Sequence, residues 1–318
     1  MPLIDRPDYK PPFLLFNGHL QTIYPSLFRS VKVKYERERI KTPDDDFLDL
    51  DWSRVLNSKK LVILSHGLEG DSNRQYIIGM VNNLNKNGYN ALAWNYRGCS
   101  GEMNKNYRFY HSGSSDDLKF VIDYILSNYN YDEVYLIGFS LGGNITLKYI
   151  GETRNNLDKR IKKGMAISVP CDLSGSAKKM ALLSNKIYMQ RFINQLKKKL
   201  IDKKKQFPDK ISIDNYYLIK SFHQFDDQYT APIHGFKDAE EYYLLNSSIY
   251  FLDTISIPTL ILNAKNDPFL SSGCFPYEQA KKSKFLFLET PGQGGHCGFP
   301  YKKDLTYSEK RALEWIGN

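Results

Sequence analysis

The chain has 318 residues, of which 42% are hydrophobic and 14% aromatic; this excludes an intrinsically disordered protein and allows a large buried core. No apolar run approaches the roughly 18 residues of a membrane-spanning helix, and the first residues lack a signal-peptide pattern, so we expect a cytoplasmic protein. The formal net charge is +9, concentrated in lysine-rich runs at 159–164 and 195–207, which we interpret as solvated helix faces and not as a nucleic-acid site, with weak contact to an anionic membrane surface as the alternative.

The predicted elements begin with an antiparallel hairpin whose strands cover 31–40 and 47–52. After it, short apolar runs alternate with helical patterns. The predicted strands cover 60–66, 89–98, 133–139, 163–169, 257–264 and 284–290, and the predicted helices cover 73–87, 116–129, 141–152, about 276–283, and 308–315. Continuous apolar strands that alternate with helices indicate a mostly parallel sheet covered by helices on both faces. The fold class is therefore α/β.

The stretch 174–256 lacks this strand and helix alternation, and we interpret it as an inserted, mainly helical cap. A basic amphipathic helix is expected at about 185–205, with Met189, Phe192, Ile193, Leu196 and Leu200 on one face. We expect this face to pack onto the core domain, with membrane contact as the alternative. The prediction is one domain over 1–318, with an N-terminal arm at 1–30, a core at 31–173 and 257–318, and the cap between the two core segments.

Ser140 is the candidate nucleophile. It is the serine of a G-x-S-x-G motif, Gly138 to Gly142, that lies where a predicted strand meets a predicted helix. The glycines relieve crowding around a serine held in a strained backbone conformation, and the turn exposes its hydroxyl beyond the carboxyl end of the strand. A simple Gly/Ser turn is the alternative for the pentapeptide alone, but its place between strand and helix favours a nucleophile.

A serine hydroxyl needs a base to take its proton and an acid to orient that base. Of the six histidines, only His296 follows the last predicted strand, in a glycine-rich loop. Asp267 follows the strand at 257–264, which gives the order Ser, Asp, His, and Asp172 after the preceding strand is the competing acid. The other histidines are expected to shape the pocket, the donor loop or the cap: His19, His66, His111, His223 and His234.

The backbone N–H groups of Leu141 and Leu68 are the candidate oxyanion donors. Leu141 follows the nucleophile, and Leu68 lies in the loop after the strand at 60–66. His66 in that loop is expected to be a structural hydrogen-bonding residue. The four cysteines are scattered without a C-x-x-C pair, which indicates free thiols, and a metal site at His296 and Cys297 is disfavoured because adjacent side chains point apart. No cofactor and no metal are implied.

Several stretches of the chain resemble, in order, the YheT-like branch of the α/β-hydrolase superfamily, also called AB hydrolase family 4. They are NGHLQTIYPSLFR (17–29), SHGLEGDSNRQYI (65–77), NYRGCSGE (95–102), GFSLGGN (138–144), VPCDLS (169–174), YTAPIHGF (229–236), ILNAKNDPF (261–269) and GGHCGF (294–299). The resemblance implies an α/β-hydrolase fold with an inserted cap, esterase-type activity, and a triad of Ser140, Asp267 and His296. This sequence departs from the family pattern at Gly18, where proline is common, and at Asn266, where an acid is common.

The sequence thus predicts a serine hydrolase that cleaves a small-molecule carboxylic ester through an acyl-enzyme. Phe222, Phe225, Tyr229 and Phe236 of the cap suggest that the pocket takes an apolar acyl group. Two alternatives stay open. An acyltransferase or thioesterase would use the same triad, and a non-catalytic small-molecule binder would keep only the fold.

Overall fold

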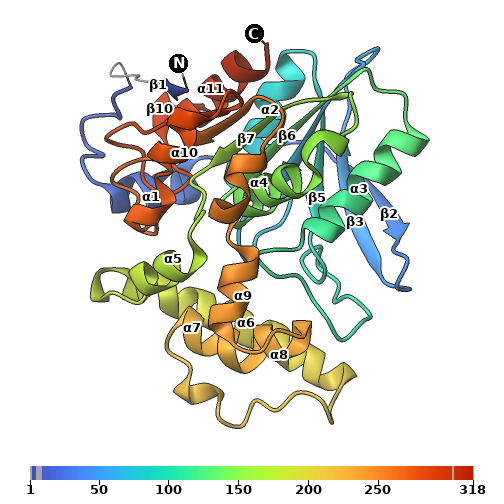
Figure 1. The fold of residues 1–318 in the computed structure, drawn as a ribbon, viewed down its shortest axis with the longest axis vertical. Coiled ribbons are helices and arrows are strands. Elements are labelled where there is room, and N and C mark those ends of the chain that lie inside the picture. Colours follow the sequence, from blue (N-terminus) through green and yellow to red (C-terminus); the bar gives the residue numbers. More distant parts are fainter. Residues whose placement is uncertain (1, 5–8, 303, 318) are drawn as a thin grey trace.

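The computed structural model describes residues 2–4, 9–302 and 304–317, and its central element is a twisted β-sheet (Figure 1). The strands of this sheet are β1 (Leu3–Ile4), β2 (Glu36–Lys41), β3 (Phe47–Ser53), β4 (Lys60–Ser65), β5 (Asn90–Asn95), β6 (Glu133–Phe139), β7 (Ile161–Ile167), β8 (Thr259–Leu262) and β9 (Leu286–Glu289). Among the described residues their order across the sheet is β1-β9-β8-β7-β6-β4-β5-β3-β2. β10 (Pro300–Lys302) and β11 (Leu305–Thr306) form a separate antiparallel pair.

The pairing directions confirm a mostly parallel sheet that carries an antiparallel hairpin at one edge. β2 pairs antiparallel with β3, β3 pairs antiparallel with β5, and the remaining neighbours are parallel. The first strand of the hairpin begins at Glu36 and not at residue 31. The residues before it are held outside the sheet: the N–H of Val31 donates to Gln75 Oε1 in α2 (Gln75–Lys86) at 3.2 Å, and the Tyr35 hydroxyl donates to the carbonyl of Ser72 at 2.9 Å. The parallel strands β4, β6, β8 and β9 direct their carboxyl ends to one edge of the sheet.

The helices cover both faces of the sheet, as predicted. They are α1 (Gly18–Phe28), α2 (Gln75–Lys86), α3 (Ser115–Asn128), α4 (Leu141–Thr153), α5 (Leu173–Met180), α6 (Lys186–Gln206), α7 (Phe222–Phe225), α8 (Ala231–His234), α9 (Ala239–Asn246), α10 (Tyr277–Lys282) and α11 (Tyr307–Gly317). Short 3₁₀ turns are η1 (Arg154–Asn156), η2 (Leu183–Asn185), η3 (Tyr216–Leu218), η5 (Ser248–Thr254) and η6 (Ser272–Cys274), and η4 (Asp226–Thr230) is a π-helix. Alternate residues of β4 reach opposite faces: Leu61 and Ile63 join the core cluster with α3 and α4, whereas Val62 and Leu64 join that with α2 and α11.

Helices α5 to α9 lie together at one end of the molecule, the lower end in Figure 1. The basic amphipathic helix expected at 185–205 is α6, and its apolar face is buried. Ile193 and Leu196 share a core cluster with Phe109 and Phe269, which belong to the segments predicted as the core. The expected packing of α6 onto the core is confirmed. The division into arm, core and cap stays a prediction, and its residues 1, 5–8, 303 and 318 lie outside the described residues.

The lysines of α6 do not all face solvent. Lys199 and Lys203 are buried, and the Lys203 ammonium group donates to the carbonyl of Asn104 at 2.8 Å. These two cations therefore bind the core of the protein and are not available to a membrane surface. Across the residues that the structure describes, no helix is both long and apolar enough to cross a bilayer.

Candidate active site

Ser140 lies in a tight turn between β6 and α4, as the sequence predicts. Its backbone has φ 53° and ψ −121°, a conformation that a residue with a side chain rarely adopts. The turn is held on both sides: the Ser140 N–H donates to the carbonyl of Ile167 at 2.9 Å, and the Ser140 carbonyl accepts from the N–H of Gly143 at 2.9 Å. The strained serine is therefore fixed by backbone hydrogen bonds to β7 and to the first turn of α4.

The glycines on either side of Ser140 are required by close backbone contacts. A Cβ atom at Gly138 would lie 2.2 Å from the carbonyl oxygen of Gly142, and one at Gly142 would lie 2.3 Å from that of Ser65. Only glycine allows strand β6 and helix α4 to meet this closely and to pack against the end of β4. The predicted reason for the two glycines, relief of crowding around the serine, is confirmed.

Ser140, His296 and Asp267 form a continuous chain of hydrogen bonds. His296 Nε2 lies 2.9 Å from Ser140 Oγ, and His296 Nδ1 lies 2.8 Å from Asp267 Oδ2. The serine hydroxyl is thus placed to donate to one ring nitrogen while the other ring nitrogen donates to the carboxylate. The structure brings together three side chains that are far apart in the sequence.

The charge of Asp267 controls the protonation of His296. Burial alone disfavours the imidazolium form, but the adjacent Asp267 carboxylate outweighs this effect and holds the pKa of His296 above its ordinary value of 6.5. The Asp267 side chain is fully buried behind the ring, and its Oδ1 also accepts the N–H of Phe269 at 2.9 Å. Asp267 is therefore held in direct contact with the imidazole of His296.

Helix α1 holds the loop that carries His296, a role not visible from the sequence alone. The N–H of His296 donates to Thr22 Oγ1 at 2.8 Å, and the N–H of Gly294 donates to Gln21 Oε1 at 2.8 Å. Gln21 is completely buried. The stretch NGHLQT, which includes Gln21 and Thr22, is one of the stretches that resemble the family. Composition and periodicity give no reason for that stretch, and this was the signal that could have indicated its role.

The two predicted oxyanion donors lie beside the serine. Leu68 and Leu141 both line the same cavity as Ser140 and His296. In the described part of the chain, neither backbone N–H donates to another protein group. Leu141 is the first residue of α4, where backbone N–H groups have no partner within the helix. Two free N–H groups therefore accompany the candidate nucleophile.

His66 has the structural role expected for it. Its Nδ1 donates to the carbonyl of Gly67 at 2.8 Å, and its Nε2 accepts the N–H of Tyr96 at 3.3 Å. Burial, which is the main cause, lowers the pKa of His66 to about 3, so the ring is neutral. This neutral imidazole shapes the loop that presents Leu68.

The other candidate residues lie elsewhere. Asp172, the competing acid, caps helix α5 by accepting the N–H of Gly175 at 2.9 Å and the hydroxyl of Ser271 at 3.0 Å. The remaining histidines have other contacts: His19 pairs with Tyr188, His223 lies beside Glu240, and the rings of His111 and His234 contact each other. Of the histidines, His296 is the one placed within hydrogen-bonding distance of Ser140 among the described residues.

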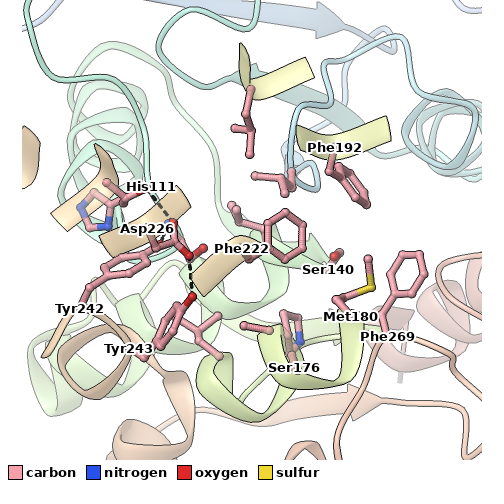
Figure 2. Close-up of a pocket in the computed structure, with 18 of the residues that line it drawn as sticks. His111, Ser140, Ser176, Met180, Phe192, Phe222, Asp226, Tyr242, Tyr243 and Phe269 are labelled. Carbon is pink, nitrogen blue, oxygen red and sulfur yellow. Dashed lines mark hydrogen bonds between the residues drawn. The ribbon is translucent and has the colours of Figure 1, made fainter. Parts of the chain in front are cut away.

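A mainly apolar cavity of about 120 Å³ opens onto Ser140 (Figure 2). Its apolar wall is supplied by the core residues Leu68, Phe109, Leu141 and Phe269 and by the cap residues Met180, Phe192, Leu196 and Phe222. Of the cap aromatics expected here, Phe222 lines the cavity. Phe225 and Tyr229 are instead buried with their rings against Tyr216, and Phe236 packs on Tyr242. Each of the four cysteines is a free thiol, and no group of three or more metal-binding side chains occurs in the described residues.

Comparison with known proteins finds similarity along nearly the whole chain. The family described as alpha/beta hydrolase fold matches residues 60–303. YheT of Escherichia coli (strain K12), which is provisionally named an esterase, is 33% identical over 94% of this chain and 90% of its own. Phospholipase ABHD3 of Mus musculus is 28% identical over 97% of this chain and 78% of its own. The solved structure of the Pyrococcus furiosus esterase Pf2001 covers 91% of this chain and 97% of its own with a TM-score of 0.59, and at 18% identity this likeness concerns the fold.

Proposed function

The chain belongs to the YheT-like branch of the α/β-hydrolase superfamily, and on that premise we propose that it is a serine hydrolase that cleaves carboxylic esters. The observation that carries the proposal is the hydrogen-bonded chain from Ser140 Oγ through His296 to Asp267, in which Ser140 and His296 line a mainly apolar cavity. The names of the relatives, an esterase and a phospholipase among them, support the same class of reaction.

In the first half-reaction, Ser140 Oγ attacks the carbonyl carbon of the ester while its proton passes to His296 Nε2. The backbone N–H groups of Leu68 and Leu141 donate to the oxyanion of the tetrahedral intermediate. When the intermediate collapses, the alcohol leaves with the proton from His296, and the acyl group stays on Ser140. Asp267 keeps the imidazole in the correct tautomer and stabilises its charged form throughout.

In the second half-reaction, His296 takes a proton from water, and the resulting nucleophile attacks the acyl-enzyme. A second tetrahedral intermediate then releases the carboxylic acid and restores Ser140. The chemistry needs no cofactor. The apolar side chains of the cavity, such as Phe192 and Phe222, favour a substrate with an apolar chain, because its transfer from water into the cavity is favourable.

A fluorophosphonate probe tests the proposal, because it forms a covalent bond only with an activated serine. The unmodified chain should be labelled and Ser140→Ala should not. Ser176→Ala, which removes a second hydroxyl from the same cavity, should still be labelled. Labelling of Ser140→Ala to the same extent as the unmodified chain would overturn the assignment. A series of p-nitrophenyl esters of increasing acyl length, with Ser140→Ala as the blank, then measures ester cleavage itself.

A further inference from the structure

One wall of the cavity carries a carboxylate, in contrast to the apolar side chains around Ser140. Asp226 lines the cavity from the cap, where it begins the π-helix η4. In the view of Figure 2, Asp226 and Tyr243 lie to one side of Phe222 and Ser140 lies to the other. π-Helical turns are rare and occur frequently at functional sites. The cavity therefore joins the candidate nucleophile to an acidic group through an apolar middle section.

The protein leaves the charge of Asp226 unbalanced. Its two carboxylate oxygens each accept one hydrogen bond from a neutral hydroxyl, Oδ1 from Thr230 and Oδ2 from Tyr243, both at 2.7 Å. No lysine or arginine of the described residues forms an ion pair with it. Burial is the main influence on the carboxyl group and raises its pKa to about 6. A carboxylate in such surroundings is costly unless a ligand supplies a hydrogen-bond donor or a positive charge.

The neighbouring histidines His111 and His223 do not form an ion pair with Asp226. His111 lines the same part of the cavity, and its Nδ1 accepts the N–H of Gly113 at 3.1 Å. Burial lowers the pKa of His111 well below its ordinary value, so its ring is neutral. The charge of His223 lowers the pKa of Asp226, but by less than the hydroxyls of Thr230 and Tyr243 do. The His223 side chain is about half exposed, and its Nε2 lies 3.3 Å from the carboxylate of Glu240. Within the described ranges, no cationic side chain forms an ion pair with Asp226.

Each oxygen of an ionised carboxylate can accept about two hydrogen bonds, and one is used on each oxygen of Asp226. We propose that Asp226 anchors the end of the substrate far from the reacting carbonyl, and that the site takes an ester whose apolar chain ends in a hydroxyl group or a protonated amine. Both groups are hydrogen-bond donors that satisfy the free acceptor positions. The aromatic side chains of Tyr242 and Phe222 also line the cavity, and aromatic rings attract an ammonium ion. A chain that ends in a carboxylate or phosphate is excluded by repulsion from Asp226.

This inference rests on the proposed function, but a binding measurement tests it without turnover. Ser140→Ala is titrated calorimetrically with hexylammonium, hexan-1-ol and hexanoate. Hexylammonium and hexan-1-ol should each bind at least about tenfold more tightly than hexanoate. This ratio is expected when one end group donates a hydrogen bond to Asp226 and the other is a carboxylate that Asp226 repels. Adding Asp226→Asn should abolish the preference for hexylammonium over hexanoate, because the negative charge is gone. The preference for hexan-1-ol over hexanoate should remain, because an amide oxygen still accepts a hydrogen bond. Adding Asp226→Leu should abolish both preferences.

The matched control is Asp227→Asn, because Asp227 is the next residue, is exposed, and accepts the N–H of Ala239 outside the cavity. With Asp227→Asn added, the three compounds should bind with the same order of affinity as they bind to Ser140→Ala alone, which is the parent variant. If the parent binds hexanoate as tightly as hexylammonium, or if Asp226→Leu keeps the parent's order, the subsite does not exist. Thermal unfolding of each variant identifies any variant that is not folded. If Asp226→Leu is not folded, the result for Asp226→Asn, which keeps the shape of the side chain, decides whether the subsite exists.

A kinetic arm separates the two proposals. The unmodified chain is assayed with p-nitrophenyl acetate, which is too short to fill the cavity, and with p-nitrophenyl hexanoate and p-nitrophenyl 6-aminohexanoate. If the protein hydrolyses none of the three esters, at the protein concentration at which the fluorophosphonate probe labels Ser140, the proposed ester hydrolysis is wrong. The calorimetric titration then tests the Asp226 subsite by itself. Hydrolysis of all three with kcat/KM highest for hexanoate overturns the Asp226 subsite alone.

Discussion

The ammonium nitrogen of Lys199 lies 2.9 Å from a carboxylate oxygen of Glu69, and both side chains are almost completely buried. Lys199 belongs to the cap helix α6, whereas Glu69 directly follows the candidate oxyanion donor Leu68. The Tyr110 hydroxyl donates to the Glu69 carboxylate at 2.6 Å and accepts the N–H of Glu69 at 2.8 Å. The cap is thus connected to the oxyanion loop through one buried ion pair.

Replacing Lys199 with methionine should destabilise the protein, because it leaves Glu69 buried without its cation. We expect a loss of about 3–5 kcal/mol in the free energy of unfolding, measured by urea denaturation. The double variant Lys199→Met with Glu69→Gln should recover part of this loss. Lys198→Met, on the exposed side of the same helix, should change stability by less than about 0.5 kcal/mol. Equal losses for Lys199→Met and Lys198→Met would refute the coupling.

The pair of His296 and Asp267 predicts a particular pH dependence. Ester cleavage needs neutral His296, and Asp267 raises the pKa of His296 above 6.5. The acidic limb of kcat/KM should therefore lie above pH 6.5, with activity increasing as pH rises through it. Because a raised histidine pKa stabilises the folded state, this contribution is complete below pH 6.5 and is lost as pH rises through the folded pKa.

Asp267→Asn should lower kcat by about 10⁴-fold, since the amide does not hold the correct tautomer or stabilise the imidazolium. Its acidic limb should move to lower pH, because the charge that raises the pKa of His296 is gone. Steady-state rates measured with one ester over a range of roughly pH 5 to 10 give both effects. Asp172→Asn is the control for the competing acid. If it reduces kcat as strongly as Asp267→Asn does, the assignment of the acid is wrong.

Gly142→Ala should damage the turn that presents Ser140. The new methyl group would lie 2.3 Å from the carbonyl oxygen of Ser65, so β4 or α4 must shift. Overpacking of this kind costs roughly 1–3 kcal/mol in stability, and the displaced serine should lose fluorophosphonate labelling. Gly292→Ala is a suitable control, because a Cβ atom there meets nothing within 4 Å. Unchanged labelling in Gly142→Ala would contradict the close fit.

The sequence predicts the sheet and the order of Ser140, Asp267 and His296 because these depend on local signals. Continuous apolar runs mark the buried parallel strands, and the residues after those strands must meet at one edge of the sheet. The very short strands could not be found this way: β1 and β11 contain two residues each, too few to show a period.

Features that depend on distant contacts were not predictable. Helix α1 contains Pro25 and exposes several apolar residues, so its sequence lacks a clear amphipathic pattern. Its role in holding the His296 loop depends on the hydrogen bond between His296 and Thr22, which are 274 residues apart in the sequence. Asp226 likewise reads as a surface acid in the stretch FDDQ. Its partial burial depends on Tyr243 and on a cavity wall that two parts of the chain build together.

The two positions where this sequence departs from its family, Gly18 and Asn266, are in contact. A Cβ atom at Gly18 would lie 2.0 Å from the carbonyl oxygen of Asn266. The Asn266 amide donates to Gln21 Oε1 at 2.9 Å and to Gln293 Oε1 at 2.8 Å, and its oxygen accepts the N–H of Gly295 at 3.1 Å. The amide is the second donor to each glutamine oxygen, because Gln21 Oε1 also accepts the N–H of Gly294 and Gln293 Oε1 also accepts the amide of Gln21. A carboxylate at this position would place a further acceptor against both oxygens.

Asn266→Asp should therefore weaken the support of the His296 loop. A carboxylate cannot donate to the two glutamine oxygens, and we expect a loss of about 1–3 kcal/mol in the free energy of unfolding. The added negative charge beside Asp267 should also raise the pKa of His296 further, so that the acidic limb of kcat/KM moves to higher pH. Asn130→Asp adds the same charge at the opposite end of β6 and should change neither quantity. An unmoved limb together with full stability in Asn266→Asp would mean that the amide network does not support the histidine loop.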